Sequence, residues 1–152
     1  MSSWSPVLRF VNEPSDRYPF SHGSNLIALD DDRLVCVWFA GSSEGHADTA
    51  ILMAECHRSR FHDPWRGPLW SEPVAIAHED GQAVGNPVLF CESVNDWWLF
   101  YSTFPPRKGN NTTVRYQTSR DGGLSWSPAQ TLTERLGYWT RHPVAILSDG
   151  AW

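Results

Sequence analysis

Short stretches rich in aromatic and β-branched residues recur along the chain. Residues 34–39, 97–101 and 112–118 are such stretches, and their composition and alternation favour β-strands. Clusters of Asp, Ser and Asn at residues 30–32 and 93–96 precede the first two stretches and indicate turns. We find no helical periodicity of any length. The pattern therefore predicts an all-β protein.

The motifs also recur in the same order. A Trp-Ser-Pro or Trp-Ser-x-Pro segment occurs at residues 4–6, 70–73 and 126–128, and Asn-Pro-Val at 86–88 is matched by His-Pro-Val at 142–144. A repeat period of 56 to 66 residues, with about four short strands in each unit, is typical of β-propeller blades. We predict one partial propeller domain with blade-like units at about 4–69, 70–125 and 126–152.

This division gives about two and a half four-stranded antiparallel blades, whereas a closed propeller has at least about four. Open blades would leave bare sheet edges and an exposed apolar face. Three outcomes fit the pattern. The chain is part of a longer protein, copies associate as a homo-oligomer that completes the ring, or the strands form a compact sandwich.

Residues 119–126 follow a Ser-x-Asp-x-Gly-x-x-Trp pattern between two expected strands. Asp121 can accept hydrogen bonds from the backbone of a tight turn, and Gly123 can adopt a positive φ. Trp126 is large enough to wedge between sheets. The pattern, which begins at Ser119, resembles the Asp-box of the sialidase (neuraminidase) superfamily, whose β-propellers carry it between the third and fourth strands of several blades. The resemblance implies a structural corner that lies away from the active site.

Residues 38–52 leave one aromatic strand and enter the next through a loop that contains Glu44, His46 and Asp48. This loop looks like the first-blade sialidase loop that presents the general acid/base carboxylate at the mouth of the propeller. The resemblance implies that Glu44 or Asp48 protonates a glycosidic leaving group, with His46 as a substrate contact. In the alternative interpretation, Asp48 caps the strand entry and Glu44 is only solvated.

The chain departs from the superfamily just upstream of this loop. Sialidases carry Arg-Ile-Pro at the entry to the first inner strand, where the arginine helps to bind the substrate carboxylate. Residues 22–24 are His-Gly-Ser instead. Because histidine lacks the guanidinium fork, this departure argues against the same mode of sialic-acid binding.

Nearly the whole chain resembles the N-terminal portion of a bacterial neuraminidase-like group, in which His-x-Ser, Gly-x-x-Glu-Gly-x-x-Asp, Asn-Pro-Val, an Asp-box and a final Pro-Val follow in order. Related propellers include polysaccharide lyases that act on uronic acids with a histidine and a tyrosine. The resemblance makes His22 a candidate base. Asn86, Arg141 and His142, each expected to enter an innermost strand, would be further ligand contacts. Alternatively, these residues only serve turns and strand entries.

The composition argues against several classes of binding partner and cofactor. A net charge of −5 gives no basic surface for nucleic acid or for an anionic membrane. No apolar run reaches the roughly 18 residues of a membrane span, and no signal peptide is visible, so we expect a cytoplasmic protein. The three cysteines are expected to be free thiols. The six histidines show no ligand spacing for a metal, and we expect no cofactor.

We therefore predict a carbohydrate-directed, sialidase-like glycoside hydrolase fragment that acts on acidic sugars. Two alternatives stay open. One is a non-catalytic sugar-binding or self-assembling propeller module that uses exposed Trp faces as stacking platforms. The other is a lyase-like propeller with a histidine base.

Overall fold

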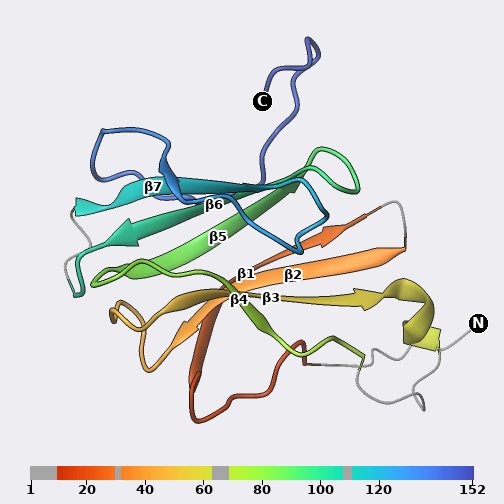
Figure 1. Cartoon of the computed structure of the whole chain (residues 1–152), viewed down its shortest axis with the longest axis horizontal. Coiled ribbons are helices and arrows are strands. Elements are labelled where there is room, and N and C mark those ends of the chain that lie inside the picture. Colours follow the sequence, from red (N-terminus) through yellow and green to blue (C-terminus); the bar gives the residue numbers. More distant parts are fainter. Residues whose placement is uncertain (1–9, 30–31, 63–68, 108–110) are drawn as a thin grey trace, which may run out of the picture.

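The computed structural model describes residues 10–29, 32–62, 69–107 and 111–152. In this part of the chain, two four-stranded antiparallel sheets pack face to face (Figure 1). Sheet A has the order β1-β2-β3-β4 and sheet B the order β5-β6-β7-β8. The prediction of an all-β protein is confirmed. The elements are β1 (Phe20–Ala28), β2 (Arg33–Gly41), β3 (Ala50–His57), the short 3-10 helix η1 (Arg58–His62), β4 (Val74–Ala77), β5 (Ala83–Cys91), β6 (Trp97–Phe104), β7 (Thr113–Ser119) and β8 (Gln130–Thr131).

The main hydrophobic core lies between the two sheets. Successive side chains of a strand point to opposite faces, so every second residue of the central strands β2 and β6 enters this core. Val35 and Val37 of β2 and Trp97 and Leu99 of β6 are all fully buried there. Burial of this apolar surface is the main term that holds the two sheets together.

The faces that point away from the core are covered differently. On sheet A, Trp38 and Leu52 pack against Val11, Tyr18 and Trp70. The outer face of sheet B carries four aromatic residues, and the ring of Trp152 lies over three of them at centroid distances of 5.0 to 6.2 Å. We call these four residues the aromatic face; they are Phe90, Trp98, Phe100 and Tyr116.

The sheets and the sequence repeat differ in phase. The strand after Trp70 is β4, which pairs with β3, and the strand after Trp126 is β8, which pairs with β7. Each of these tryptophan segments therefore precedes the last strand of one sheet, not the first strand of the next. The Trp-Ser-Pro segment at residues 4–6 and the turn residues 30–31 lie outside the described residues.

The expected innermost strand of the third unit is not formed. Residues 132–152 contain no strand, although Arg141 and His142 were expected to enter one. A strand needs a neighbour that satisfies its backbone N–H and C=O groups, and the described residues include no third sheet beside this segment. The segment instead runs as a loop along sheet B.

The Asp-box residues form a tight turn between β7 and β8. Asp121 Oδ1 accepts hydrogen bonds from Ser125 N at 2.9 Å and from Ser119 Oγ at 2.8 Å. Bonds from the Ser125 hydroxyl, the Ser125 backbone and the Ser119 hydroxyl lower the pKa of Asp121 to about 2. Gly123 has φ +90, and a Cβ there would lie 2.4 Å from the Trp97 ring. Only glycine fits this contact, because both the space and the backbone exclude a side chain.

Candidate functional site

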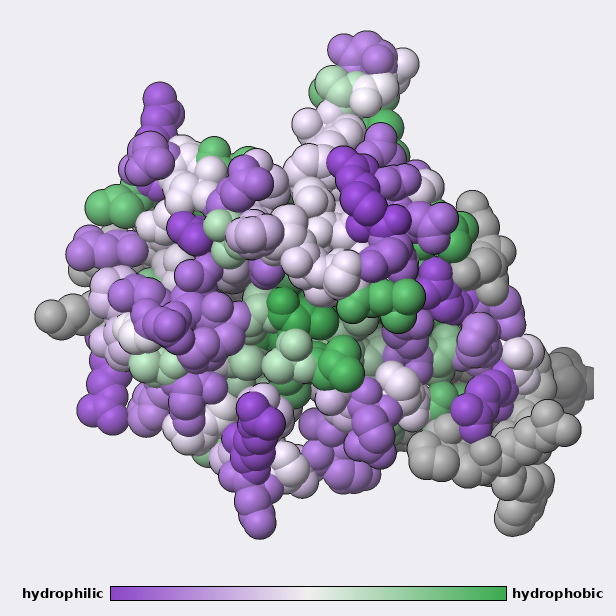
Figure 2. Space-filling view, viewed as in Figure 1, coloured by the Kyte–Doolittle hydropathy of each residue, from purple (hydrophilic) through white to green (hydrophobic). Residues whose placement is uncertain are grey.

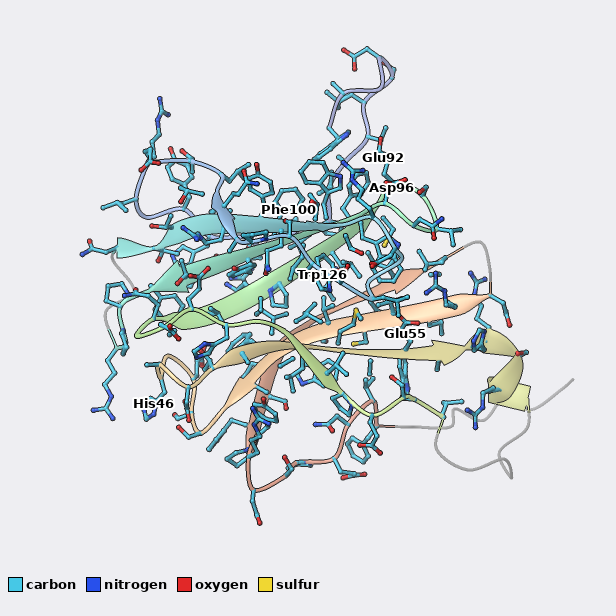
Figure 3. The ribbon with its side chains drawn as sticks, in the orientation of Figure 1. His46, Glu55, Glu92, Asp96, Phe100 and Trp126 are labelled. Atoms are coloured by element: carbon cyan, nitrogen blue, oxygen red, sulfur yellow. The ribbon has the colours of Figure 1, made fainter. Side chains whose placement is uncertain are left out.

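The candidate site residues predicted from the loop and from the inner strands lie at one end of the sheets. β1 begins opposite the end of β2, and β5 begins opposite the end of β6. The β2–β3 loop (residues 42–49) and the described parts of the β6–β7 loop (residues 105–107 and 111–112) lie at this end, which we call the loop end, and Arg107 N donates to the Gly45 oxygen between them. The Asp-box turn follows β7 at the opposite end. Figure 3 shows this separation, with His46 at the loop end and Asp96 beside the Asp-box.

Each sheet has a bulge in its first strand near the loop end. The register of β1 shifts between His22 and Asn25, and that of β5 shifts between Gly85 and Val88. Bulges of this kind redirect side chains and are frequent beside active sites. The two bulges face each other, since Asn25 Oδ1 accepts a hydrogen bond from Leu89 N at 3.0 Å.

Within these bulges, Gly23 and Asn86 lie side by side. A Cβ on Gly23 would lie 3.4 Å from Asn86 Oδ1 and 2.8 Å from the Phe39 ring, and Gly23 has φ +60. Asn86 has a left-handed backbone with φ +48, which asparagine tolerates better than most residues. The structure thus brings the His22–Gly23 segment next to Asn86.

The ring of His22 is exposed and stacks on aromatic neighbours. Its centroid lies 5.6 Å from that of Phe39 and 6.4 Å from that of Phe20, with interplanar angles of 21° and 8°. The stack fixes the plane of the imidazole while its nitrogens stay open to solvent.

Residues 139–141 form the third part of this end. Thr140 Oγ1 donates a hydrogen bond to the backbone oxygen of Asn86 at 2.6 Å, and Thr140 N donates to Ser102 Oγ at 2.9 Å. The ring of Trp139 packs on Phe104 at 5.0 Å. Thr140 therefore holds the chain against the β5 bulge, and the exposed Arg141 follows directly. Thr140 was not predicted, because its partners lie 38 and 54 residues away in the sequence.

The two candidate acids of the β2–β3 loop differ in their contacts. Asp48 Oδ2 accepts a hydrogen bond from Ser42 N at 3.2 Å and so bridges the two ends of the loop. Glu44 is exposed at the turn of the loop. Both carboxylates are exposed, and only Asp48 has a hydrogen-bond partner within the loop.

His46 connects the two loops. Its Nδ1 lies 3.1 Å from Ser42 Oγ, and its Nε2 lies 3.3 Å from a guanidinium nitrogen of Arg107 in the β6–β7 loop. Arg107 N also donates to the Gly45 oxygen at 3.1 Å. Arg107 was not among the predicted site residues, because it lies 61 residues from His46 and in a stretch that reads as an extended loop.

The predicted residues are thus gathered only in part. The bulge segments, Thr140 with its neighbour Arg141, and the loop of Glu44 share the loop end. His142 is exposed one residue beyond Arg141, and no contact joins either residue to His22 or Glu44 within the described part of the chain.

A buried tyrosine–carboxylate pair lies elsewhere in the fold. Tyr101 donates its hydroxyl hydrogen to Glu79 Oε1 at 2.8 Å, and the same oxygen lies 3.3 Å from Arg115 Nε. Burial, with the adjacent Glu79, raises the pKa of Tyr101. Tyr101 has no exposed surface, so its hydroxyl cannot meet a ligand, and the pair ties the β4–β5 connection to sheet B.

An open groove of about 490 Å³ lies between sheet A and the Asp-box turn, and not at the loop end. Figure 2 shows apolar side chains gathered between the sheets on this face. The groove is lined by residues of β3 and β4 and by the turn, including Glu55, Val74, Leu124 and Trp126. Its walls are mainly apolar, and it contains none of the predicted ligand contacts, so we place the candidate site at the loop end instead.

Two searches of the described residues found nothing further. In the described ranges, no helix is long and apolar enough to cross a membrane. The same ranges contain no group of three or more His, Cys, Asp or Glu residues that could hold a metal ion.

Solved structures of similar fold include the following two proteins. One is a protein of unknown function from Dyadobacter fermentans DSM 18053, with a TM-score of 0.65 and 12% identity over 90% of this chain. The other is the Hadza microbial sialidase Hz136, with a TM-score of 0.58 and 11% identity over 77% of this chain. The chain spans only 46% and 27% of the lengths of these proteins. A comparison with curated proteins found no match.

A family model described as a BNR repeat-like domain matches residues 32–152. This range includes seven of the eight strands, β2 to β8, and the whole Asp-box turn. Together with the similarity of fold to a sialidase, the match identifies the two sheets as sialidase-like propeller blades. The chain belongs to the BNR repeat-like domain family.

Proposed function

We propose that this protein is a carbohydrate-directed, sialidase-like glycoside hydrolase module whose ligand is an acidic sugar bound at the loop end. The observation that carries the proposal is the meeting of the β1 bulge, the β5 bulge and the Thr140–Arg141 segment at the end where the β2–β3 loop presents Glu44. Bulged strand ends and loops on a rigid sheet are where proteins commonly build binding sites.

Glu44 is the proposed proton donor. Cleavage of a glycosidic bond requires a proton on the leaving oxygen, and a positioned carboxylic acid supplies it. Both Glu44 and Asp48 are exposed, but Oδ2 of Asp48 accepts a hydrogen bond from Ser42 N, so we choose Glu44 as the acid and keep Asp48 as the alternative.

The proposed ligand contacts are His22, Asn86, Arg141 and His142, with His46 at the edge of the loop. The Arg141 guanidinium can bind a sugar carboxylate through two parallel hydrogen bonds. The Asn86 side chain can both donate to and accept from hydroxyl groups. Because Asn86 is held by the bulge and Arg141 follows the bonded Thr140, both would be presented from a defined backbone.

Substitution of the proposed acid tests this function. With 4-methylumbelliferyl glycosides of N-acetylneuraminic acid and of glucuronic acid as substrates, we expect Glu44→Gln to lower the rate by about 100-fold or more, because the amide cannot give up a proton. Glu92→Gln, an exposed carboxylate at the opposite end, is the matched control and should leave the rate unchanged. Full activity of Glu44→Gln would refute the role of Glu44. Binding without turnover in the wild type would favour a non-catalytic sugar-binding module.

A second candidate function, self-assembly, is supported by the aromatic face of sheet B. Phe90 and Trp98 are only half-buried although Trp152 covers part of them. Large aromatic surfaces of this kind are typical of association sites. We expect copies of the chain to associate through this face, so light scattering after size exclusion should give a dimer or larger species. A monomer at all concentrations would exclude assembly.

The lyase-like alternative rests on His22, whose exposed imidazole could remove a proton from a uronic acid. It is tested with a uronic-acid oligosaccharide linked through C4, in which loss of the C5 proton expels the sugar at C4 and leaves an unsaturated uronate that absorbs ultraviolet light. This product should be lost in His22→Ala but not in Glu44→Gln.

A further inference from the structure

Arg107 presents a positive charge at the loop end that no described carboxylate neutralises. Arg33, Arg115 and Arg120 each lie within 3.4 Å of a carboxylate oxygen, of Glu55, Glu79 and Asp96 respectively. The exposed Arg107 side chain instead contacts a neutral acceptor, His46 Nε2, at 3.3 Å. A guanidinium has five N–H donors, so most of its hydrogen-bonding capacity is open to a ligand.

His46 is held between Arg107 and the start of its own loop. A guanidinium can donate but not accept, so Nε2 of His46 is the acceptor in the contact with Arg107. Its Nδ1 lies 3.1 Å from Ser42 Oγ. An imidazole carries no negative charge, so His46 holds the guanidinium in place without neutralising its charge.

The backbone at Arg107 is also fixed. Arg107 has φ +59, a conformation that is unfavourable for a residue with a long side chain. Its N–H donates to the oxygen of Gly45, the residue after Glu44, at 3.1 Å. Unfavourable backbone conformations persist where the surrounding structure imposes them, and they are frequent at ligand sites. Asn86, with φ +48, is a second such residue at the same end.

We propose that Arg107, held by His46, binds the carboxylate of the acidic sugar and so selects it over neutral sugars. This inference rests on the proposed function, because it assigns a further contact to the same site. Arg107 supplies the guanidinium fork, and its backbone is bonded to Gly45, directly beside the proposed proton donor.

The test is a titration of the whole chain followed by NMR of arginine Nε–Hε and backbone amide signals. N-acetylneuraminate and its methyl ester form one matched pair of probes, and D-glucuronate and D-glucose form another. In each pair, the second compound lacks the charged carboxylate of the first. We expect the Arg107 signal to shift with the two acids and not with the two neutral sugars.

The variants Arg107→Asn and Arg107→Lys test the guanidinium itself. Asparagine tolerates the left-handed backbone and removes the charge, so we expect binding of the acids to weaken about fivefold or more. Lysine keeps the charge but not the fork and should give an intermediate loss. Arg120→Asn makes the same change at the opposite end and should bind normally. The ring ¹⁵N shifts of His46 should report the Nδ1–H tautomer in the wild type and change in Arg107→Asn.

The outcomes separate this inference from the proposed function. If the Asn86 amide shifts with acidic sugars while Arg107 does not, Arg107 is not a ligand contact and the proposed site stands. If Arg107 shifts and Asn86 does not, the carboxylate site exists but the proposed function at the bulges fails. If neither shifts, both are wrong. If Arg107→Asn fails to fold, the wild-type titration and the Arg107→Lys variant still test whether Arg107 contacts the sugar carboxylate.

Discussion

At the residue scale, left-handed backbone occurs at both ends of the sheets. At the loop end, Asn86 and Arg107 adopt positive φ although neither is glycine, at a cost of roughly 1–2 kcal/mol for each residue. Asp32, with φ +72, is a third such residue in the β1–β2 turn at the opposite end. The Asp-box turn uses Gly122 and Gly123 for its positive φ at no such cost.

Gly123 offers a direct test of the structural role of the turn. A Cβ at this position would lie 2.4 Å from the buried Trp97 ring, whereas Gly137, with a similar φ of +85, has open space around it. We expect Gly123→Ala to lower the free energy of unfolding by roughly 2–4 kcal/mol, the sum of backbone and overpacking costs. Gly137→Ala should cost only about 1 kcal/mol, from the backbone alone.

Chemical denaturation of the two variants measures this difference. Equal losses for Gly123→Ala and Gly137→Ala would mean that the Asp-box turn is not packed on Trp97 in solution. Gly123 lies at the opposite end from the proposed site, so sugar binding should be unaffected in Gly123→Ala if that variant folds.

At the element scale, the sequence was informative where a strand is buried on both faces. Residues 34–39, 97–101 and 112–118 were predicted as strands from composition alone, and they lie in or within one residue of β2, β6 and β7. Their apolar residues alternate between two packed faces, so the pattern is strong. The prediction failed at residues 142–145, because the local sequence resembles a first strand but no neighbouring strand is there to pair with it.

The candidate site was only partly predictable for a related reason. Glu44, Asp48 and His46 share one loop, so their proximity follows from sequence. The contacts that hold the loop end together join segments that are far apart in the sequence. Examples are the contacts of Arg107 with His46 and of Thr140 with Asn86. Such contacts depend on how the two sheets pack, which spacing along the chain does not report.

At the scale of the whole molecule, the two blades separate structure from proposed function. The Asp-box turn packs against the start of β2 and the β5–β6 turn at one end, where Gly122 N donates to the Asn95 oxygen. The β2–β3 and β6–β7 loops, with the inner-strand bulges, meet at the other end. Two stacked sheets with one shared core therefore form both ends.

The central claim is that the loop end, and not the groove beside the Asp-box, receives the sugar. The most direct measurement is a map of backbone amide shifts across the whole chain on titration with N-acetylneuraminate and D-glucuronate. We predict shifts at residues 22–25, 42–48, 85–88 and 139–142. Shifts confined to the groove, at residues 53–55, 74–76 and 123–126, would contradict the account.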